Sequence, residues 1–277
     1  MMALAIVVLG FSSCTKDPVP VDPNEPAVVT TASAEKVVGA YRGYTLAACA
    51  YFSDMFTADE NVVISLVNDS TVKVEFASAV WGEFVIGEAL VKGTQAPYTV
   101  SGNGTCKMTG MGGNINEYDC SFSASLDMDG ADEMSFSVPA VMGGTTVTFK
   151  EGTAPLGYYV AGKYDGTLNY GVGEMGDEPV EASVTLKRNG DDKIDIVLPA
   201  VGEGMMTIPE IALTDIAIST TDYKVFAIAE TEINQTVGTI NYVGSITGEV
   251  NNGTLKLNYS LQPGAMPMSI NFTFEGE

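Results

Sequence analysis

Four acidic side chains, Asp127, Asp129, Asp132 and Glu133, gather within one short stretch. Carboxylates at such density are the ligands that a calcium loop uses. The stretch nevertheless lacks the spacing and the terminal bidentate glutamate of an EF-hand, and its Asp129-Gly130 pair is typical of a hairpin turn. We therefore interpret it as a solvated turn and predict no metal site.

Two cysteines, Cys106 and Cys120, flank the glycine-rich turn Gly110-Met-Gly-Gly113 almost symmetrically. In a hairpin they would face each other across neighbouring strands, and a disulfide there would contribute about 3 kcal/mol in an oxidising compartment. We predict this disulfide, with two free thiols as the alternative. Cys49 is expected to be a small buried hydrophobe, and no histidine accompanies the cysteines to complete a zinc site.

Histidine is absent from the sequence, so the commonest general base, proton shuttle and metal ligand is missing. The sequence also contains no nucleophile elbow, metalloprotease helix motif, phosphate-binding loop or cysteine–histidine pair. A glycosidase needs two carboxylates about 5–10 Å apart, and nothing in the spacing of the 35 acidic residues selects such a pair. We therefore predict no catalytic residues, no cofactor and no enzymatic activity.

Another group of residues suits binding rather than catalysis. Methionine and aromatic side chains adapt to irregular apolar ligands, but they also fill gaps in ordinary cores. We expect the repeated tyrosines Tyr41 and Tyr164 to be core anchors rather than ligand contacts. Both interpretations stay open for the candidate ligand-lining residues, which are Trp81, Phe84, Met205, Met206, Met266 and Met268.

The balance of charges narrows the classes of partner. The chain of 277 residues carries 35 acidic and 13 basic side chains, which gives a net charge of −22. Such a chain lacks the cations that displace counterions from phosphates, which argues against nucleic acid and anionic membrane surfaces as partners. A solvated acidic surface is the simplest interpretation of the charge.

The N-terminus has the pattern of a secreted and anchored protein. The apolar run Ala3-Leu-Ala-Ile-Val-Val-Leu9 is too short to span a bilayer, and Gly10-Phe-Ser-Ser-Cys14 follows it. This pattern resembles the lipobox of bacterial lipoproteins, in which the leader is removed and the new N-terminal cysteine is acylated. The resemblance implies a signal peptide over residues 1–13 and a lipid on Cys14, which would bind the protein to a membrane.

The segment after Cys14 indicates where the anchored chain resides. Lys16-Asp17 resembles the short signal that directs lipoproteins of Bacteroides-type bacteria to the outer face of the outer membrane. Proline is frequent in the same segment and large apolar side chains are scarce, so we predict a stiff, disordered tether over residues 14–34. The expected location is the outer membrane, with the folded part at the cell surface.

One stretch of the chain occurs twice behind the tether. Gly39-Ala-Tyr41-Arg-Gly43 returns as Gly162-Lys-Tyr164-Asp-Gly166, and similar patterns follow each copy. Apolar and polar residues alternate, and turn pairs such as Asn189-Gly190 separate the alternating runs, which indicates antiparallel strands. We predict an all-β chain of two tandem eight-stranded up-and-down barrels, over residues 35–152 and 153–277. A sandwich is the alternative, because periodicity alone does not show closure.

Three motifs of the second copy carry a family resemblance. They are the Tyr164-Asp-Gly-Thr-Leu168 opening, the Gly204-Met-Met-Thr-Ile-Pro-Glu210 segment and the Asn252-Gly-Thr-Leu-Lys-Leu257 hairpin. They resemble the calycin-like, or lipocalin-like, barrel domain of Bacteroides-type lipoproteins, over residues 164–276 and more loosely over 39–150. The resemblance implies an eight-stranded barrel with an uncharacterised binding role and without family catalytic residues.

These observations together predict an outer-membrane-anchored, non-enzymatic lipoprotein that binds a small apolar or glycan-derived ligand in a β-barrel. The alternative is a structural or interaction lipoprotein of the cell envelope, whose barrel surface contacts a protein or polysaccharide partner. The interior of each barrel separates the two hypotheses, because a container is hollow and a solid module is filled.

Overall fold

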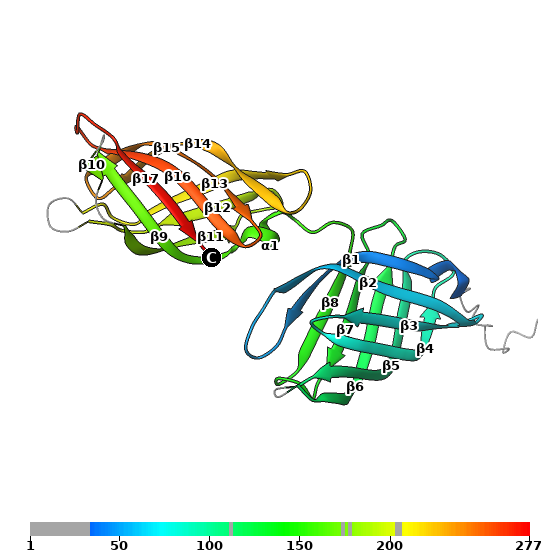
Figure 1. The fold of residues 1–277 in the computed structure, drawn as a ribbon. Coiled ribbons are helices and arrows are strands. Elements are labelled where there is room, and N and C mark those ends of the chain that lie inside the picture. Colours follow the sequence, from blue (N-terminus) through cyan, green and yellow to red (C-terminus); the bar gives the residue numbers. More distant parts are fainter. Residues whose placement is uncertain (1–33, 111–112, 173–174, 177–178, 203–206) are drawn as a thin grey trace, which may run out of the picture.

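The structure is a computed structural model that describes residues 34–110, 113–172, 175–176, 179–202 and 207–277. Within these residues nearly all regular structure is β-strand, and the strands form two separate bodies (Figure 1). The predicted signal peptide, Cys14 and nearly all of the predicted tether lie outside the described residues.

Eight antiparallel strands close the first barrel. Each strand pairs with the next along the chain, and β1 pairs with β8. Buried and exposed residues alternate along these strands, as expected when one face of a pleated strand lines a core. The barrel consists of η1 (Ala34–Val37), β1 (Gly39–Ala48), β2 (Met55–Asn68), β3 (Thr71–Ser78), β4 (Gly82–Lys92), β5 (Tyr98–Thr109), β6 (Ile115–Leu126), β7 (Glu133–Val138) and β8 (Thr145–Glu151).

The second barrel repeats this topology. Its strands pair in chain order and β9 closes the ring with β17, while the two-residue β10 adds to the edge of β9. The two closures confirm the predicted fold and exclude the sandwich alternative. The barrel consists of α1 (Gly157–Val160), β9 (Gly162–Val172), β10 (Met175–Gly176), β11 (Val180–Arg188), β12 (Lys193–Leu198), β13 (Ile211–Thr220), β14 (Val225–Val237), β15 (Ile240–Asn251), β16 (Thr254–Pro263) and β17 (Ile270–Gly276).

The repeated tyrosine has the same role in both barrels. The hydroxyl of Tyr41 donates a hydrogen bond to the carbonyl of Val37 in η1, and the hydroxyl of Tyr164 donates to the carbonyl of Val160 in α1, both at 2.8 Å. Burial raises the pKa of both tyrosines, to about 12 for Tyr41, so that each hydroxyl keeps its proton and remains a donor. Both tyrosines are buried, as expected of core anchors, and each ties a short helix to its barrel.

The repeated glycine two positions after each tyrosine allows the barrels to close. A Cβ on Gly43 would lie 1.9 Å from the carbonyl oxygen of Lys150, and a Cβ on Gly166 would lie 2.1 Å from that of Glu275. At these points β1 pairs with β8, and β9 pairs with β17. The Tyr-x-Gly repeat is therefore explained by packing and closure.

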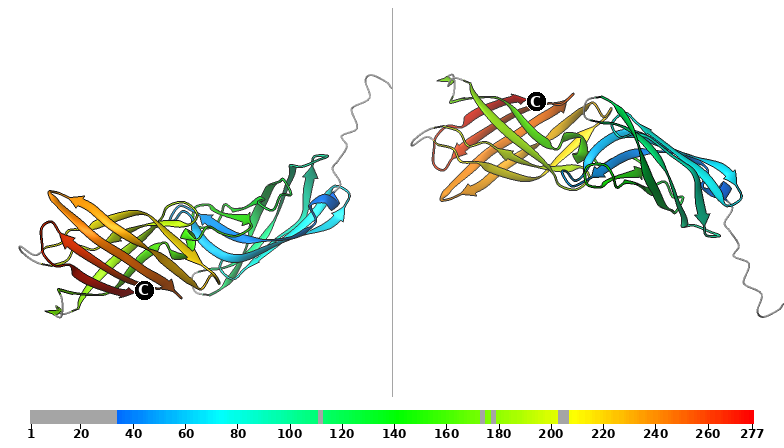
Figure 2. Two further views of the ribbon diagram at one scale, coloured as in Figure 1. Left: turned by 90° about the horizontal axis from the view of Figure 1, so that it is seen from above. Right: turned by 90° about the horizontal axis from the view of Figure 1, so that it is seen from below.

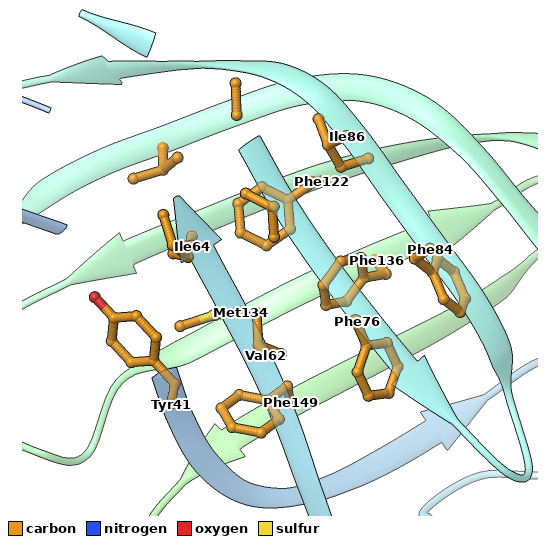
Figure 3. Packing of buried hydrophobic residues seen from close by; sticks show 14 of the residues in the cluster. Tyr41, Val62, Ile64, Phe76, Phe84, Ile86, Phe122, Met134, Phe136 and Phe149 are labelled. Atoms are coloured by element: carbon orange, nitrogen blue, oxygen red, sulfur yellow. The ribbon is translucent and has the colours of Figure 1, made fainter. Parts of the chain in front are cut away.

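The two cores differ in their side chains. Barrel 1 has a central cluster of phenylalanine rings, with the ring of Phe136 centred 5.2 Å from those of Phe76 and Phe84 and 5.0 Å from that of Phe122. Figure 3 shows these rings pointing toward one another across the interior. The buried residues of barrel 2 are mainly isoleucine, leucine and valine.

A single segment joins the barrels, which lie next to each other along the length of the molecule (Figure 2). The chain leaves β8 after Glu151 and enters α1 at Gly157. The short helix α1 precedes the first strand of barrel 2, as η1 precedes the first strand of barrel 1. The joint between the barrels therefore contains α1, which accepts the hydrogen bond from Tyr164.

Candidate functional site

Aromatic rings connect the two barrels at this joint. The ring of Phe56, on β2, stacks on Tyr158 of α1 with centroids 5.2 Å apart and meets Tyr159 edge-on at 5.0 Å. Tyr44, on β1, lies 6.0 Å from both Phe56 and Tyr158. The guanidinium carbon of Arg188 sits 3.7 Å from the centre of the Tyr158 ring, a cation–π contact. These contacts pack α1 between the barrels and fix one barrel against the other.

A cleft of about 980 Å³ opens beside this joint, which we call the inter-barrel cleft. Barrel 1 contributes residues of β1 and β2, the joining segment contributes its first residues, and barrel 2 contributes α1 and the β13–β14 turn. Tyrosine and charged side chains dominate the lining. Its residues are Ala40, Arg42, Gly43, Tyr44, Asp59, Glu60, Asn61, Gly152, Thr153, Ala154, Tyr159, Asp222, Tyr223 and Lys224.

Side-chain hydrogen bonds to the backbone fix the conformation of the β13–β14 turn, which lines part of the cleft. The carboxylate of Asp222 accepts the N–H groups of Lys224 and Val225 at 2.9 and 3.2 Å. These bonds lower the pKa of Asp222, so its charge persists at neutral pH. The hydroxyl of Thr220 accepts the N–H of Tyr223 at 3.0 Å and donates to the carbonyl of Val225 at 2.7 Å. The turn is therefore preorganised.

Two lining residues have an unusual backbone conformation. Asp59 has φ of 57° and Tyr223 has φ of 56°, in the left-handed region that residues with side chains rarely adopt. For a residue as bulky as tyrosine this conformation is strained, and such strain concentrates at functional sites. In this conformation Tyr223 remains 45 % exposed, and its ring centre lies 5.5 Å from that of Tyr159. The two rings form a partly exposed aromatic surface.

The cleft is lined by both acidic and basic side chains, and its basic side chains are available to a ligand. In a strongly acidic chain, Arg42 and Lys224 both line the cleft, and neither forms an ion pair with any described residue. Burial, with the nearby Asp59 carboxylate, raises the pKa of Tyr159, which therefore presents a neutral hydroxyl. The cleft thus offers donors, acceptors and aromatic faces together.

The residues predicted to line a ligand pocket do not gather around one cavity. Phe84 is fully buried in the barrel 1 core, with its ring centre 5.5 Å from that of Phe76. Trp81 is 3 % exposed and packs against Phe52 at 6.1 Å between ring centres. Both residues fill the interior of barrel 1, so the core-filling alternative applies to them.

The predicted methionines of barrel 2 that the structure describes do not line the inter-barrel cleft. Met266 and Met268 precede β17, which begins at Ile270, so they belong to a loop and not to the predicted strand. Met266 packs against the edge of the core, whereas Met268 is 47 % exposed. Met205 and Met206 lie outside the described residues.

The predicted disulfide is not formed, since Cys106 and Cys120 are both free. The register pairs Cys106 with Tyr118 and Gly104 with Cys120, so the cysteines are diagonal neighbours rather than directly opposite. Burial raises the pKa of both thiols, to about 12 for Cys120. They therefore remain protonated and weakly nucleophilic. Cys49, expected to be buried, is only partly so.

The acidic stretch forms a turn between β6 and β7. The carboxylate of Asp132 is buried and accepts the N–H of Asp127 at 2.6 Å, and Asp129 accepts the N–H of Ala131 at 3.1 Å. Asp129 and Asp132 thus serve the backbone of their own turn, whereas Glu133 pairs with Lys150 at 3.1 Å. Among the described residues, no three metal-ligating side chains gather at one point. In the same part of the chain, no helix combines the length and apolar character of a membrane span.

Sequence reasoning missed the inter-barrel cleft. Its lining comes from both copies of the repeat and from the joining segment, so no local pattern marks it. One signal was available, because Tyr158-Tyr159 adds two aromatic residues just before the second Tyr-x-Gly motif, whereas Glu35-Lys36 stands in the matching place of the first copy.

Comparison with known proteins agrees with this fold. The calycin-like β-barrel domain model matches residues 160–277, which is the second barrel. A crystal structure of a candidate outer membrane protein from Bacteroides fragilis is 28% identical, with a TM-score of 0.76, and the alignment covers 89% of this chain and 100% of that one. No curated protein matches the sequence.

A second solved structure also aligns with most of the chain. A protein of unknown function from Nostoc punctiforme aligns over 88% of this chain and 97% of its own, but at 13% identity and a TM-score of 0.23, which carries no argument. The likeness to the Bacteroides fragilis protein supports a place in the cell envelope. The chain is a tandem of two eight-stranded barrels, and its second barrel matches the model of the calycin-like β-barrel domain.

Proposed function

We propose that this protein is a non-enzymatic binding lipoprotein of the outer membrane and that its ligand site is the inter-barrel cleft. The observation that carries the proposal is the cleft itself, about 980 Å³ in volume and lined by tyrosine and charged side chains from both barrels. Ligand sites commonly occupy clefts of about 300–1,000 Å³ between domains, with aromatic walls and a few placed polar groups.

The barrel interiors suit a ligand less well. The ring of Phe136 makes close contacts with three other phenylalanine rings inside barrel 1. In barrel 2 the ring of Phe272 stacks on Tyr259 with centroids 4.4 Å apart. Packed interiors of this kind have few voids larger than water. We therefore propose that the ligand binds in the inter-barrel cleft and not inside a barrel.

The lining of the cleft favours a glycan-derived ligand over an apolar one. The ring faces of Tyr159 and Tyr223 are apolar and flat, and they suit the C–H face of a sugar ring. Arg42, Asp59 and Asn61 supply donors and acceptors for sugar hydroxyls, and an apolar ligand would leave these groups without partners. The net charge of −22 opposes a polyanionic ligand.

The outer-membrane part of the proposal has two supports. The sequence before the first barrel resembles a lipoprotein leader that ends at Cys14. The Bacteroides fragilis protein, which matches over its entire length, is itself described as a candidate outer membrane protein. An acyl chain on Cys14 would bind the two barrels to the membrane through the tether.

Affinity electrophoresis in native gels that contain laminarin, xylan or dextran tests the cleft. We expect at least one polysaccharide to retard the protein, and Tyr223→Ala to weaken that binding about tenfold, as loss of an aromatic hot spot does. Tyr51→Ala is the matched control, because Tyr51 is 80 % exposed on barrel 1 but does not line the cleft.

Four outcomes would contradict this proposal. Absence of retardation by every polysaccharide would exclude glycan binding, and equal losses in Tyr223→Ala and Tyr51→Ala would remove the cleft from it. Release of reducing sugar ends by the native protein, abolished in Asp59→Asn, would show an enzyme instead of a binding protein. Recovery of a recurring envelope protein after crosslinking, without polysaccharide retardation, would favour the structural alternative.

A further inference from the structure

Buried hydrogen-bonding groups without partners lie near one end of barrel 1. The hydroxyls of Thr45 and Thr57 and the indole N–H of Trp81 have no hydrogen-bond partner among the described residues. Thr45 is fully buried, and Trp81 is 3 % exposed. Native proteins leave very few buried polar groups unpaired, and an unobserved water or ligand usually explains the exceptions.

These groups belong to one cluster. Thr45 and Thr57 are direct partners across β1 and β2, and Glu60 follows on β2, opposite Gly43. The carboxylate of Glu60 accepts a hydrogen bond from the hydroxyl of Ser78 at 2.6 Å, and that hydroxyl accepts the backbone N–H of Trp81 at 3.1 Å. We call Thr45, Thr57, Glu60, Ser78 and Trp81 the Glu60 cluster.

Glu60 itself is only partly satisfied. It is 6 % exposed, and Ser78 is its one hydrogen-bond partner in the described part of the chain. A buried carboxylate normally accepts several hydrogen bonds or faces a cation, because burial in isolation is costly. Glu60 forms no ion pair with any residue that the structure describes. Burial raises its pKa, and the Ser78 hydrogen bond opposes that shift.

The second barrel shows that the fold does not require these polar groups. Tyr41 pairs with Val62 in barrel 1 as Tyr164 pairs with Val184 in barrel 2, which aligns the two registers. The partners that correspond to Thr45 and Thr57 are then Leu168 and Val180, and the residue that corresponds to Glu60 is Ala182. All three barrel 2 residues are apolar. The Glu60 cluster is therefore a property that barrel 1 has and its duplicate lacks.

The donors and acceptors of the cluster define what can satisfy it. The indole N–H of Trp81 only donates, so a guest must accept a hydrogen bond there. An ionised Glu60 only accepts, so the same guest must donate, whereas a protonated Glu60 can do either. An ammonium ion cannot accept and a halide ion cannot donate. A hydroxyl can do both, in either protonation state of Glu60.

We propose that the Glu60 cluster is an internal binding site for a hydroxyl-type guest, which is either ordered water or the hydroxyl of a small polyol. The guest accepts from Trp81, donates to Glu60 and pairs with the hydroxyls of Thr45 and Thr57. The site adjoins the inter-barrel cleft at Glu60, which lines both, whereas Thr45, Thr57 and Trp81 do not line the cleft.

Trp81 is the single tryptophan of the chain, so its fluorescence reports on this site alone. We expect the double variant Thr45→Val/Thr57→Val to shift the emission of Trp81 to shorter wavelength, because the guest is lost and the indole becomes drier. The double variant Thr45→Ser/Thr57→Ser keeps the hydroxyls and should retain the native emission. Thr71→Val is the matched control, because Thr71 also has a buried unpaired hydroxyl but begins β3, at the opposite end of the strand from Ser78.

A crystal structure of the native chain, with and without glycerol, provides the direct test. We expect electron density within hydrogen-bond distance of both the Trp81 indole nitrogen and a Glu60 carboxylate oxygen, and its loss in the double valine variant. Glycerol density with a saturable change in Trp81 emission identifies a polyol, and a single peak unchanged by glycerol identifies water. The Tyr223→Ala variant should respond as the native protein does, which separates this site from the cleft.

Empty density between these groups would overturn the proposal. It would equally fail if the double valine variant and Thr71→Val gave the same emission as the native chain. If the double valine variant does not fold, the electron density of the native chain still tests the proposal.

Discussion

The two barrels share a backbone design but differ in what fills them. Both keep the tyrosine that binds the preceding helix, at 2.8 Å in each case, and both keep the glycine at the closing strand pair. Barrel 1 then has a central cluster of phenylalanine rings and a polar end, whereas the buried residues of barrel 2 are mainly isoleucine, leucine and valine. The duplication has kept the parts that close a barrel, while the interior has diverged.

This difference indicates which constraints act on which residues. Closure depends on backbone contacts that allow no side chain, so the glycines cannot vary. Interiors tolerate extensive replacement when total volume is kept. One copy could therefore acquire Glu60 and two threonines where the other has alanine, leucine and valine. The following predictions test the comparison, from the largest expected effect to the smallest.

Loss of a central ring should destabilise barrel 1 most. Phe136 is fully buried and contacts three other phenylalanine rings, so Phe136→Ala leaves a large cavity and should cost about 4 kcal/mol. Trp81 fluorescence during urea unfolding measures the loss in barrel 1. Hydrogen exchange in barrel 2 should stay unchanged, and equal deprotection of both barrels would show that they unfold as one unit.

The closing glycines should be almost as sensitive, and equally so in both copies. Gly43→Ala and Gly166→Ala each place a Cβ about 2 Å from a backbone carbonyl oxygen that cannot move aside, and each should cost about 3 kcal/mol in its own barrel. Hydrogen exchange mass spectrometry, which resolves the two barrels, measures both losses. Gly87→Ala, at a position in β4 where φ is not positive and a Cβ meets no atom within 4 Å, controls for the loss of a glycine. A mild effect at either closing position would contradict shared closure.

The tyrosine hydrogen bonds should contribute less, and again equally. Tyr41→Phe and Tyr164→Phe remove one buried hydroxyl each and leave a helix carbonyl without its partner, so we expect a loss of about 1 kcal/mol in each barrel. The free energy of unfolding from urea titrations gives both values. A loss confined to one barrel would show that the two tyrosines have separate roles.

The smallest effect should depend on pH and should occur in barrel 1 only. Burial raises the pKa of Glu60, so the folded chain holds its proton more tightly than the unfolded chain. Its contribution to stability is complete below the ordinary glutamate pKa and is lost as the pH rises through the raised folded value. Compared with Glu60→Gln, the native barrel 1 should therefore lose stability with increasing pH across that window.

Melting temperatures followed by Trp81 fluorescence at several pH values provide the measurement. The general repulsion of a chain with a net charge of −22 also grows with pH. It affects the native protein and Glu60→Gln alike, so the difference between them isolates Glu60. A constant difference across the whole range would show that Glu60 does not titrate in this window.

Much of the fold could be predicted because its signals are local. Alternation along each strand and turn pairs such as Asn189-Gly190 identify strands directly, and the repeated Tyr-x-Gly motif reveals the duplication. The predicted disulfide between Cys106 and Cys120 was wrong because it depended on the exact position of the hairpin turn. Thr109 pairs with Ile115, which offsets the register from the one that would place Cys106 opposite Cys120, and the spacing of cysteines does not report where a hairpin turns.

The sequence by itself determined the all-β character and the two copies, because alternation and turn pairs act between near neighbours in the chain. The tertiary structure decided that phenylalanine rings fill barrel 1, that Glu60 is buried beside unpaired hydroxyls, and that a cleft opens between the barrels. Each of these depends on side chains from strands far apart in the chain. Their contacts form only when both rings of strands have closed and the joining segment has set one against the other.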